Sequence, residues 1–317
     1  MKSLCSSILL FILSFSVHAG EIIDSAKPEH KDTSYWKTGG VGGANFSQVS
    51  YTDWAAGGQN SNTGIAFLSL YANYKKGSST WDNTLDLAYG KTELGNDAPR
   101  KSDDKIDFSS KYGHSTSNTH WFHSVLFNFK SQFDNGYNYP NDSNVISRFM
   151  APGFFVLSVG MDYKLKDYLS VFLGPITGKE TVVNAPTIAN TGAYGVTPAT
   201  YDARGYIITP GKHHLEEFGG YVKIAFKKDI MKNVNLQTKV ELFSNYLKNP
   251  QNVVVNWEML LAMKINKFIS ASIATQLMYD DKTNTKILKA DGTVASNGPR
   301  VQFKELLGVG LSYKFGK

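Results

Sequence analysis

Charged side chains recur at alternate positions inside apolar stretches of this sequence, and they are its main candidates for chemistry. From 253 to 265 the odd positions are apolar, whereas the even positions include Asn256, Glu258 and Lys264. A period of two is the period of a β-strand, so these polar residues share one face. We predict that this face points into a closed barrel, where the lumen-lining residues are Asp82, Asp86, Asp162, Lys223, Lys239, Glu241, Glu258 and Lys304.

Two roles are open to such inward charges. They can line a water-filled passage, or opposite charges can pair across the lumen and plug it. A barrel of about twelve strands leaves a modest interior once long side chains fill it. Both signs are present, so no simple anion or cation selectivity is predicted. The pattern favours a largely filled lumen with a narrow or gated passage.

Histidine and serine residues offer a second kind of chemistry, metal binding or hydrolysis. His213 and His214 are adjacent, and adjacent strand residues face opposite ways, so we do not expect them to share a metal ion. His114 and Ser115 point apart for the same reason, whereas a hydrolase needs its nucleophile and base within hydrogen-bond reach. The sequence shows no phosphate loop, zinc-ligand spacing or nucleophile elbow. We therefore predict no catalytic residue, no metal site and no cofactor, and we favour a non-enzyme.

The elements that position the charges are long amphipathic strands. Most of them exceed ten residues, whereas strands of globular proteins are usually about 5–6 residues long and tilted transmembrane strands about 9–11. The regular apolar faces of these strands predict about twelve strands in all. The predicted strands lie near 38–50, 63–75, 79–91, 104–114, 119–133, 153–165, 168–178, 215–227, 233–246, 252–265, 268–280 and 300–315.

The connections between these strands alternate between short and long. Outer-membrane barrels have tight periplasmic turns and long outer loops, so this alternation is typical of them. The longest connection, 179–214, can fold into the lumen as a constriction, cap it from outside or remain an exposed loop. Its first residues, 179–183, can extend the preceding strand.

Composition and the N-terminal segment place the chain outside the cytoplasm. Of 317 residues, 13% are aromatic, and the net charge of +6 includes no Lys/Arg block, so no nucleic-acid partner is expected. Cys5 is the single cysteine, which excludes a disulfide framework. Residues 1–19 read as a signal peptide, because a short apolar core precedes Val17-His18-Ala19. We expect Sec-type cleavage near Ala19, a flexible periplasmic lead at 20–35 and a barrel at 36–317.

A membrane location then requires a barrel. No apolar run outside the signal is long enough for a membrane helix, and only helices and closed barrels satisfy all backbone polar groups in lipid. We predict an all-β fold, a transmembrane antiparallel up-and-down barrel in the outer membrane of a Gram-negative bacterium. A secreted β-sandwich or soluble barrel, which also alternates, is the other possibility.

Three motifs carry a family resemblance. They are Trp36-Lys37-Thr38-Gly39-Gly40 with Asn45-Phe46-Ser47-Gln48-Val49-Ser50; Asp53-Trp54-Ala55-Ala56-Gly57-Gly58 with Asn60-Ser61; and Gly174-Pro175-Ile176-Thr177-Gly178-Lys179. Their order and spacing resemble an uncharacterised Bacteroidetes family, the domain of unknown function DUF3078, over most of the mature chain. The resemblance implies an outer-membrane β-barrel and brings no catalytic residue or ligand. In the second motif, Trp54, Gly57 and Gly58 predict a compact outer loop packed on the barrel mouth.

The leading functional hypothesis is small-solute passage, or surface ligand binding linked to uptake. An outer-membrane hydrolase acting on lipid or protein remains an alternative, as does a structural or adhesive barrel with a filled lumen. The expected partners are outer-membrane lipid and lipopolysaccharide, the barrel-assembly machinery and a small-molecule ligand of unknown identity. We expect a monomer.

Overall fold

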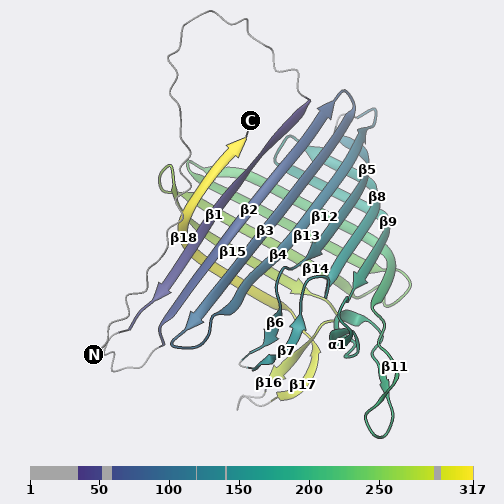
Figure 1. Ribbon diagram of the computed structural model, residues 1–317. Coiled ribbons are helices and arrows are strands. Elements are labelled where there is room, and N and C mark those ends of the chain that lie inside the picture. The colour runs from purple at the N-terminus through teal and green to yellow at the C-terminus, as the bar shows by residue number, and fades with distance from the viewer. Residues whose placement is uncertain (1–34, 52–58, 119, 140, 289–293, 317) are drawn as a thin grey trace, which may run out of the picture. The chain divides into compact units, whose positions relative to one another are not determined.

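The computed structural model describes residues 35–51, 59–118, 120–139, 141–288 and 294–316. Twelve long strands form a closed antiparallel barrel (Figure 1). Each one overlaps a predicted strand. Their bounds are β1 Trp36–Val49, β2 Ser61–Lys76, β3 Ser79–Leu94, β4 Arg100–Ser115, β5 Trp121–Ser131, β8 Gly153–Leu165, β9 Leu169–Val182, β12 His214–Met231, β13 Val234–Asn245, β14 Val253–Lys264, β15 Ile269–Tyr279 and β18 Gln302–Gly316.

The order around the ring is β1-β18-β15-β14-β13-β12-β9-β8-β5-β4-β3-β2, and β1 pairs with β18 to close it. Neighbours in the ring follow the chain, apart from the small strands in the loops. The predicted extension of the strand before the longest connection is also present. The β9–β12 ladder continues to the pair Val182–His214.

The outer wall of the barrel is apolar and exposed. On β18, Leu307 and Tyr313 are each 65% exposed, and on β8 the exposure of Leu157 is 56%. Apolar surface on this scale requires an apolar surrounding, and a closed barrel leaves no unpaired strand edge in lipid. The predicted transmembrane up-and-down barrel is therefore confirmed.

Aromatic side chains gather on the outer wall where the strands meet their short turns. The Trp36 ring centroid lies 5.3 Å from that of Tyr74 and 5.8 Å from that of Trp81. Further round the barrel, the rings of Trp121 and Tyr163 are 5.1 Å apart. Trp and Tyr prefer the boundary between hydrocarbon and water, so this belt marks one membrane interface.

The glycines of the first motif have a packing role. Gly43 lies opposite Phe67 in the β1–β2 register, and a Cβ at Gly43 would sit 2.7 Å from the Phe67 ring. Gly39 stands in the same relation to Tyr71, whose hydroxyl would be 2.6 Å from a Cβ. The missing side chains let the two inward aromatic rings lie against the backbone of β1.

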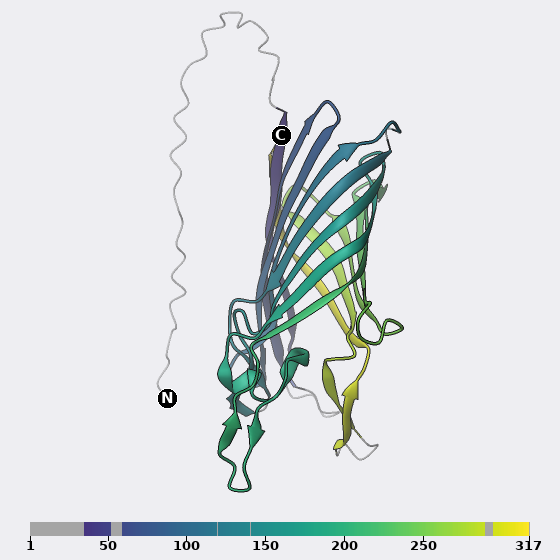
Figure 2. The same cartoon turned by 90° about the vertical axis from the view of Figure 1, so that its right-hand side faces the viewer.

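Short turns occupy one end of the barrel and long loops the other (Figures 1 and 2). The long-loop end carries all the small elements. They are β6 Gly136–Asn138, β7 Asn141–Ser147, α1 Pro186–Ala189, the short helix Ala193–Gly195, β10 Thr200–Tyr201, β11 Ile207–Thr209, β16 Asn284–Leu288 and β17 Val294–Pro299. No helix in the described ranges is both long and apolar enough to cross a membrane.

The longest loop, 183–213, is a folded cap with its own apolar core. Val183, Ile188 and Val196 are buried together with Ala151 from the preceding long loop. Tyr194 packs on this core, and its hydroxyl donates a hydrogen bond of 3.1 Å to the Ile146 carbonyl. Burial raises the pKa of Tyr194 to about 12. The cap is thus held by packing as well as by its two strand ends.

Several sequence predictions lie outside the described residues. They are the signal peptide at 1–19, the lead up to residue 34 and the loop residues Trp54, Gly57 and Gly58. The described barrel begins with β1 at Trp36.

Candidate functional site

Strand β4 supplies a row of polar side chains that cross the interior. Its inward residues are Asp103, Lys105, Asp107, Ser109 and Lys111, at every second position, and each bonds to a different strand. The contacts are Asp103 to Lys304 of β18 at 2.8 Å, Lys105 to Glu258 of β14 at 2.6 Å, Asp107 to Lys239 of β13 at 2.7 Å, Ser109 to Lys223 of β12 at 3.0 Å and Lys111 to Asp162 of β8 at 2.7 Å. We call this row the β4 ladder.

These contacts span the barrel. In the ring of strands, β4 and β14 are six places apart in either direction, so Lys105 and Glu258 meet from opposite walls. Asp107 and Lys239 come from strands five places apart. Side chains that meet in this way must lie across the interior rather than along the wall.

The ladder carboxylate Asp107 and its neighbour Glu241 are buried and share their lysines. Asp107 is 2% exposed, and Lys130 of β5 approaches it at 3.9 Å in addition to Lys239. Lys130 also contacts Glu241, which lies 3.4 Å from Lys223. A buried charge is tolerated only when it is paired and hydrogen-bonded. Removal of one charged residue therefore leaves its partners buried and unpaired, which costs a large desolvation free energy.

A second group of charges lies toward the short turns. Asp162 has no exposed surface and is 3.9 Å from Lys164, which in turn is 2.7 Å from Asp82. Ser170 donates a hydrogen bond of 2.7 Å to the other oxygen of Asp162. Asp86 lies opposite Asp107 of the β4 ladder in the β3–β4 register, and its carboxylate accepts a 2.5 Å hydrogen bond from Ser69.

The structure thus brings most of the eight predicted lumen residues together around β4. Asp162, Lys223, Lys239, Glu241, Glu258 and Lys304 contact the β4 ladder or residues that contact it, and Asp82 lies opposite Lys111 of the ladder in the β3–β4 register. The sequence prediction missed the ladder residues themselves. The signal was present, because Ile106, Phe108 and Tyr112 alternate with the ladder residues along β4.

The two sides of the barrel interior differ in side-chain size. On β5, β8, β9, β12 and β13 (the packed side), the inward residues Leu126, Phe172, Tyr221 and Phe243 form a buried cluster. On β15, β18 and β1 (the small-residue side), many inward positions are small and only partly buried, whereas Gln276, Leu306 and Lys304 are large residues on the same face. The small positions include Ser270, Ser272 and Ala274 of β15, Gly308, Gly310 and Ser312 of β18, and Gly43 and Asn45 of β1.

A charged cluster closes the barrel mouth between the two sides. Glu217 of β12 is 5% exposed and lies 3.2 Å from Lys179 and 3.0 Å from Lys282, which follows β15. Asn245 donates a 3.1 Å hydrogen bond to Glu217. We call Lys179, Glu217, Asn245 and Lys282 the mouth cluster. The cap rests on it, because a Cβ on Gly195 (φ +85°) would lie 2.9 Å from Lys282.

Two loop residues of the mouth have shifted pKa values. Burial opposes the charge of Lys282, but Asp280 and Glu217 outweigh burial and raise its pKa. Burial likewise opposes ionisation of Asp281, yet the Asn252 amide at 2.9 Å and the Lys282 ammonium lower its pKa. Both groups are therefore charged at neutral pH.

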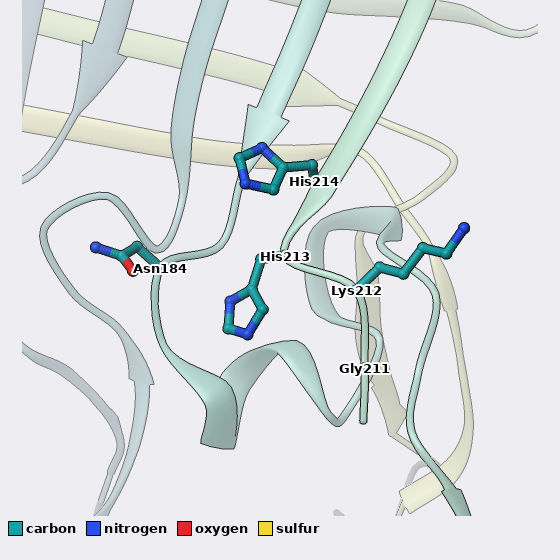
Figure 3. Close-up of a pocket in the computed structure, with 5 residues that line it drawn as sticks. All are labelled: Asn184, Gly211, Lys212, His213 and His214. Atoms are coloured by element: carbon teal, nitrogen blue, oxygen red, sulfur yellow. The ribbon is translucent and has the colours of Figure 1, made fainter. Parts of the chain in front are cut away.

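An open pocket of about 480 Å³ lies where the cap joins the barrel and is lined by Asn184, Gly211, Lys212, His213 and His214 (Figure 3). The two histidine rings point apart (Figure 3). His213 Nδ1 is 2.6 Å from the Val183 carbonyl oxygen, whereas His214 Nδ1 is 2.8 Å from the Glu180 carboxylate. In the described part of the chain, no three His, Cys, Asp or Glu side chains converge as metal ligands.

One histidine meets serine hydroxyls on the outer wall near the short turns. His114 Nδ1 is 3.3 Å from Ser79 Oγ, and its Nε2 is 3.4 Å from Ser78 Oγ. Both ring nitrogens thus contact hydroxyls, whereas a hydrolytic triad places a carboxylate on one of them. The geometry lacks the orienting group of such a triad.

The third motif forms a β-bulge on β9. The pairing with β8 shifts between Val159–Ile176 and Met161–Leu173. Thr177 Oγ1 donates a 2.9 Å hydrogen bond to the Gly174 carbonyl and is 2.6 Å from Ser158 Oγ. A bulge bends its strand and changes the direction of the side chains that follow it. On β9 these side chains include Lys179 of the mouth cluster.

Residues 46–137 match the family described as "Protein of unknown function (DUF3078)". This match confirms the predicted resemblance to that family within residues 46–137, whereas the third motif, 174–179, lies outside the matched segment. The matched segment runs from the last four residues of β1 into β6, and it includes Trp54 and the whole of the β4 ladder. No curated protein sequence matches the chain.

Solved structures similar to this chain are outer-membrane barrels. An outer-membrane channel of Pseudomonas putida F1 is 10% identical, with a TM-score of 0.39, and the alignment covers 92% of this chain and 100% of that one. Outer-membrane phospholipase A of Escherichia coli is 14% identical, with a TM-score of 0.37, and the alignment covers 90% of this chain and 94% of that one. The translocator domain of the autotransporter NalP of Neisseria meningitidis is 11% identical, with a TM-score of 0.32, and the alignment covers 90% of each chain.

Proposed function

We propose that this chain is an outer-membrane barrel that binds small polar solutes at its mouth and passes them along the small-residue side of its interior. The β4 ladder narrows this path and holds the barrel closed at rest. The exposed apolar wall, the aromatic belt and the predicted signal peptide support the membrane location. The short turns then face the periplasm and the cap faces the outside.

The contrast between the two sides of the interior carries this proposal. Large apolar side chains and buried ion pairs fill the packed side, whereas Ser272 and Gly308 on the small-residue side leave inward surface accessible. The β4 ladder that narrows the path consists of side chains, which can rearrange without the unfolding of a domain. Because the ladder contains both signs, solutes that carry both charges, or none, fit this lining better than simple ions.

Single-channel current from the purified protein in planar bilayers tests the proposal. We expect discrete, small steps from the wild-type protein. The double variant Lys105→Ala/Glu258→Ala removes a pair that spans the barrel, while Lys239 keeps its 2.7 Å contact with Asp107, so its steps should be larger. Phe108→Leu, on the outward face of the same strand, is the matched control and should leave the step size unchanged.

Silence from both the wild type and the double variant, in protein shown to be folded and inserted, would contradict solute passage. That outcome would favour a second function, surface ligand binding by a closed barrel. The folded cap and the open pocket around His213 support this alternative. The expected partners of the protein remain outer-membrane lipid and lipopolysaccharide, the barrel-assembly machinery and a small ligand. We expect the protein itself to be a monomer.

A further inference from the structure

A groove of about 530 Å³ indents the outer wall of the barrel near the long-loop end. Its apolar walls are outward side chains of β5, β8 and β12 together with one residue of the loop after β13: Phe127, Phe155, Leu157, Phe218 and Leu247. The Phe155 ring packs 4.9 Å from that of Phe129, and the Phe218 ring lies 6.0 Å from that of Tyr246. Two pairs of aromatic rings therefore stand beside the groove.

The floor of the groove is a missing side chain. Gly178 of β9 lines the groove, is exposed, and a Cβ built on it would have no atom within 4 Å. The neighbouring strands carry large outward residues, Leu157 on β8 and Phe218 on β12, which pair with Gly178 in the two registers. The apolar wall is thus interrupted by a slot one residue wide at the level of Gly178.

Two carboxylates stand at the outer end of this slot. Glu180 and Glu216 are opposite each other in the β9–β12 register, and both line the groove. Like charges directly opposite on adjacent strands are destabilising, so this pair calls for a cation. His214 lies 2.8 Å from Glu180 but is itself charged only when protonated. In the described ranges, no lysine or arginine forms an ion pair with either glutamate.

The position of the carboxylates fits the headgroup level of a membrane. Toward the short turns, the outward residues of β9 and β12 are apolar, as in Ile176, Phe218 and Val222. Glu180 and Glu216 are the first outward charges beyond this apolar band on their strands. The slot therefore runs from a negatively charged rim into the apolar band, which matches a lipid with one acyl chain below a headgroup that carries a protonated amine.

We propose that this groove is a binding site for an outer-leaflet lipid whose headgroup carries a protonated amine. One acyl chain lies in the slot over Gly178 between Leu157 and Phe218. The ammonium group lies between Glu180 and Glu216. The inference rests on the proposed membrane location and adds a specific lipid site to it. An ammonium fits this rim better than a bare divalent cation, because the described carboxylate and imidazole groups do not converge as a metal site.

Lipid retention tests the site. The full-length mature protein is reconstituted in nanodiscs of equal parts phosphatidylethanolamine and phosphatidylglycerol, extracted in detergent, and its retained lipid is identified by native mass spectrometry. We expect the wild type to retain the amine lipid over phosphatidylglycerol. Glu180→Gln/Glu216→Gln should abolish this preference, because the slot remains but the charge does not. Gly178→Leu should lower the retention of both lipids, because it fills the slot.

Gly64→Leu is the matched control. Gly64 also faces outward, and a Cβ there has no atom within 4 Å, but it lies on β2, away from the groove. Its lipid retention should equal that of the wild type. Equal retention of the two lipids by the wild type, or a Gly178→Leu variant that behaves like Gly64→Leu, would overturn the site. Retention of phosphatidylglycerol that depends on added magnesium would contradict an ammonium ligand.

The outcome separates this inference from the proposed function. Failure of the wild type to insert into the nanodiscs would contradict the membrane location and the lipid site together. Insertion without lipid preference would overturn the lipid site alone and leave solute passage to the current measurements.

Discussion

The packed side and the small-residue side of the barrel are built from the same alternating pattern, yet their interiors differ. On the packed side, Phe172 and Leu126 are at most 1% exposed, and the buried carboxylate of Asp162 contacts Lys111 of β4 and Lys164 of its own strand. On the small-residue side, inward Gly, Ser and Ala positions remain partly accessible. The period of two decides which residues point inward, but the size of those residues decides whether the interior is filled.

The largest expected difference between the two sides concerns stability. Asp107 lies on β4, but its partners Lys239 and Lys130 belong to the packed side. Asp107→Ala should destabilise the barrel by roughly 3–5 kcal/mol, because it leaves these two partly buried lysines without this carboxylate. Ser272→Ala on the small-residue side removes a 3.3 Å hydrogen bond from Asn45 and should cost about 1 kcal/mol or less. Urea unfolding in lipid vesicles measures both changes. Equal losses of unfolding free energy would remove the distinction between the sides.

Water access should differ next. The predicted mature chain contains no cysteine, since the single one is Cys5, so introduced cysteines report their own sites. Both Ser158 and Ser272 face inward, but Ser158 has no exposed surface. Ser272→Cys should react with a water-soluble thiol reagent at least about tenfold faster than Ser158→Cys, because thiol reactivity depends on exposure. Similar rates would mean that the packed side is as wet as the small-residue side.

The smallest effect concerns the mouth cluster, which joins the two sides. The lowered pKa of Asp281 means that its charge stabilises the folded mouth above the ordinary Asp value of about 3.9, and this contribution is lost as the pH falls through the folded value. The raised pKa of Lys282 has the opposite sign, so its contribution is lost only as the pH rises past the ordinary Lys value of about 10.4.

Amide hydrogen exchange of residues 280–283 measures this dependence. After correction for the intrinsic pH effect, exchange should be faster at pH 3 than at pH 6, by an amount that corresponds to ~1 kcal/mol or less. The variant Asp281→Asn should lose most of this pH step. An unchanged step in the variant would assign the effect to another group.

The sequence predicted much of the fold because the strand signal is local. Alternation in 253–265 and 300–315 identifies strands without any knowledge of their neighbours. The contacts of the charges were not predictable in the same way. That Lys105 meets Glu258 depends on strand order, tilt and shear of the whole barrel, which no short segment encodes.

The cap illustrates a second limit. Val183, Ile188 and Val196 follow neither a period of two nor one of 3.6, so their spacing predicts no element. Their shared core forms only because the loop folds back on Ala151 and Leu215, which belong to other parts of the chain. The inward charges could be predicted for the opposite reason, since each lies in a strand with a regular apolar face.

The joint between the first and last strands has a consequence for how the barrel is assembled. β1 pairs with β2 from Trp36 to Val49, but with β18 only from Gly39 to Phe46. Apart from the pair Val41–Lys314, the inward residues at this joint are glycines and other small residues, so the two strands are held mainly by backbone hydrogen bonds. We expect the β1–β18 pairing to be the last strand pairing to form during insertion and the first to separate under lateral tension. Every strand must therefore be delivered to the membrane before the ring can be sealed.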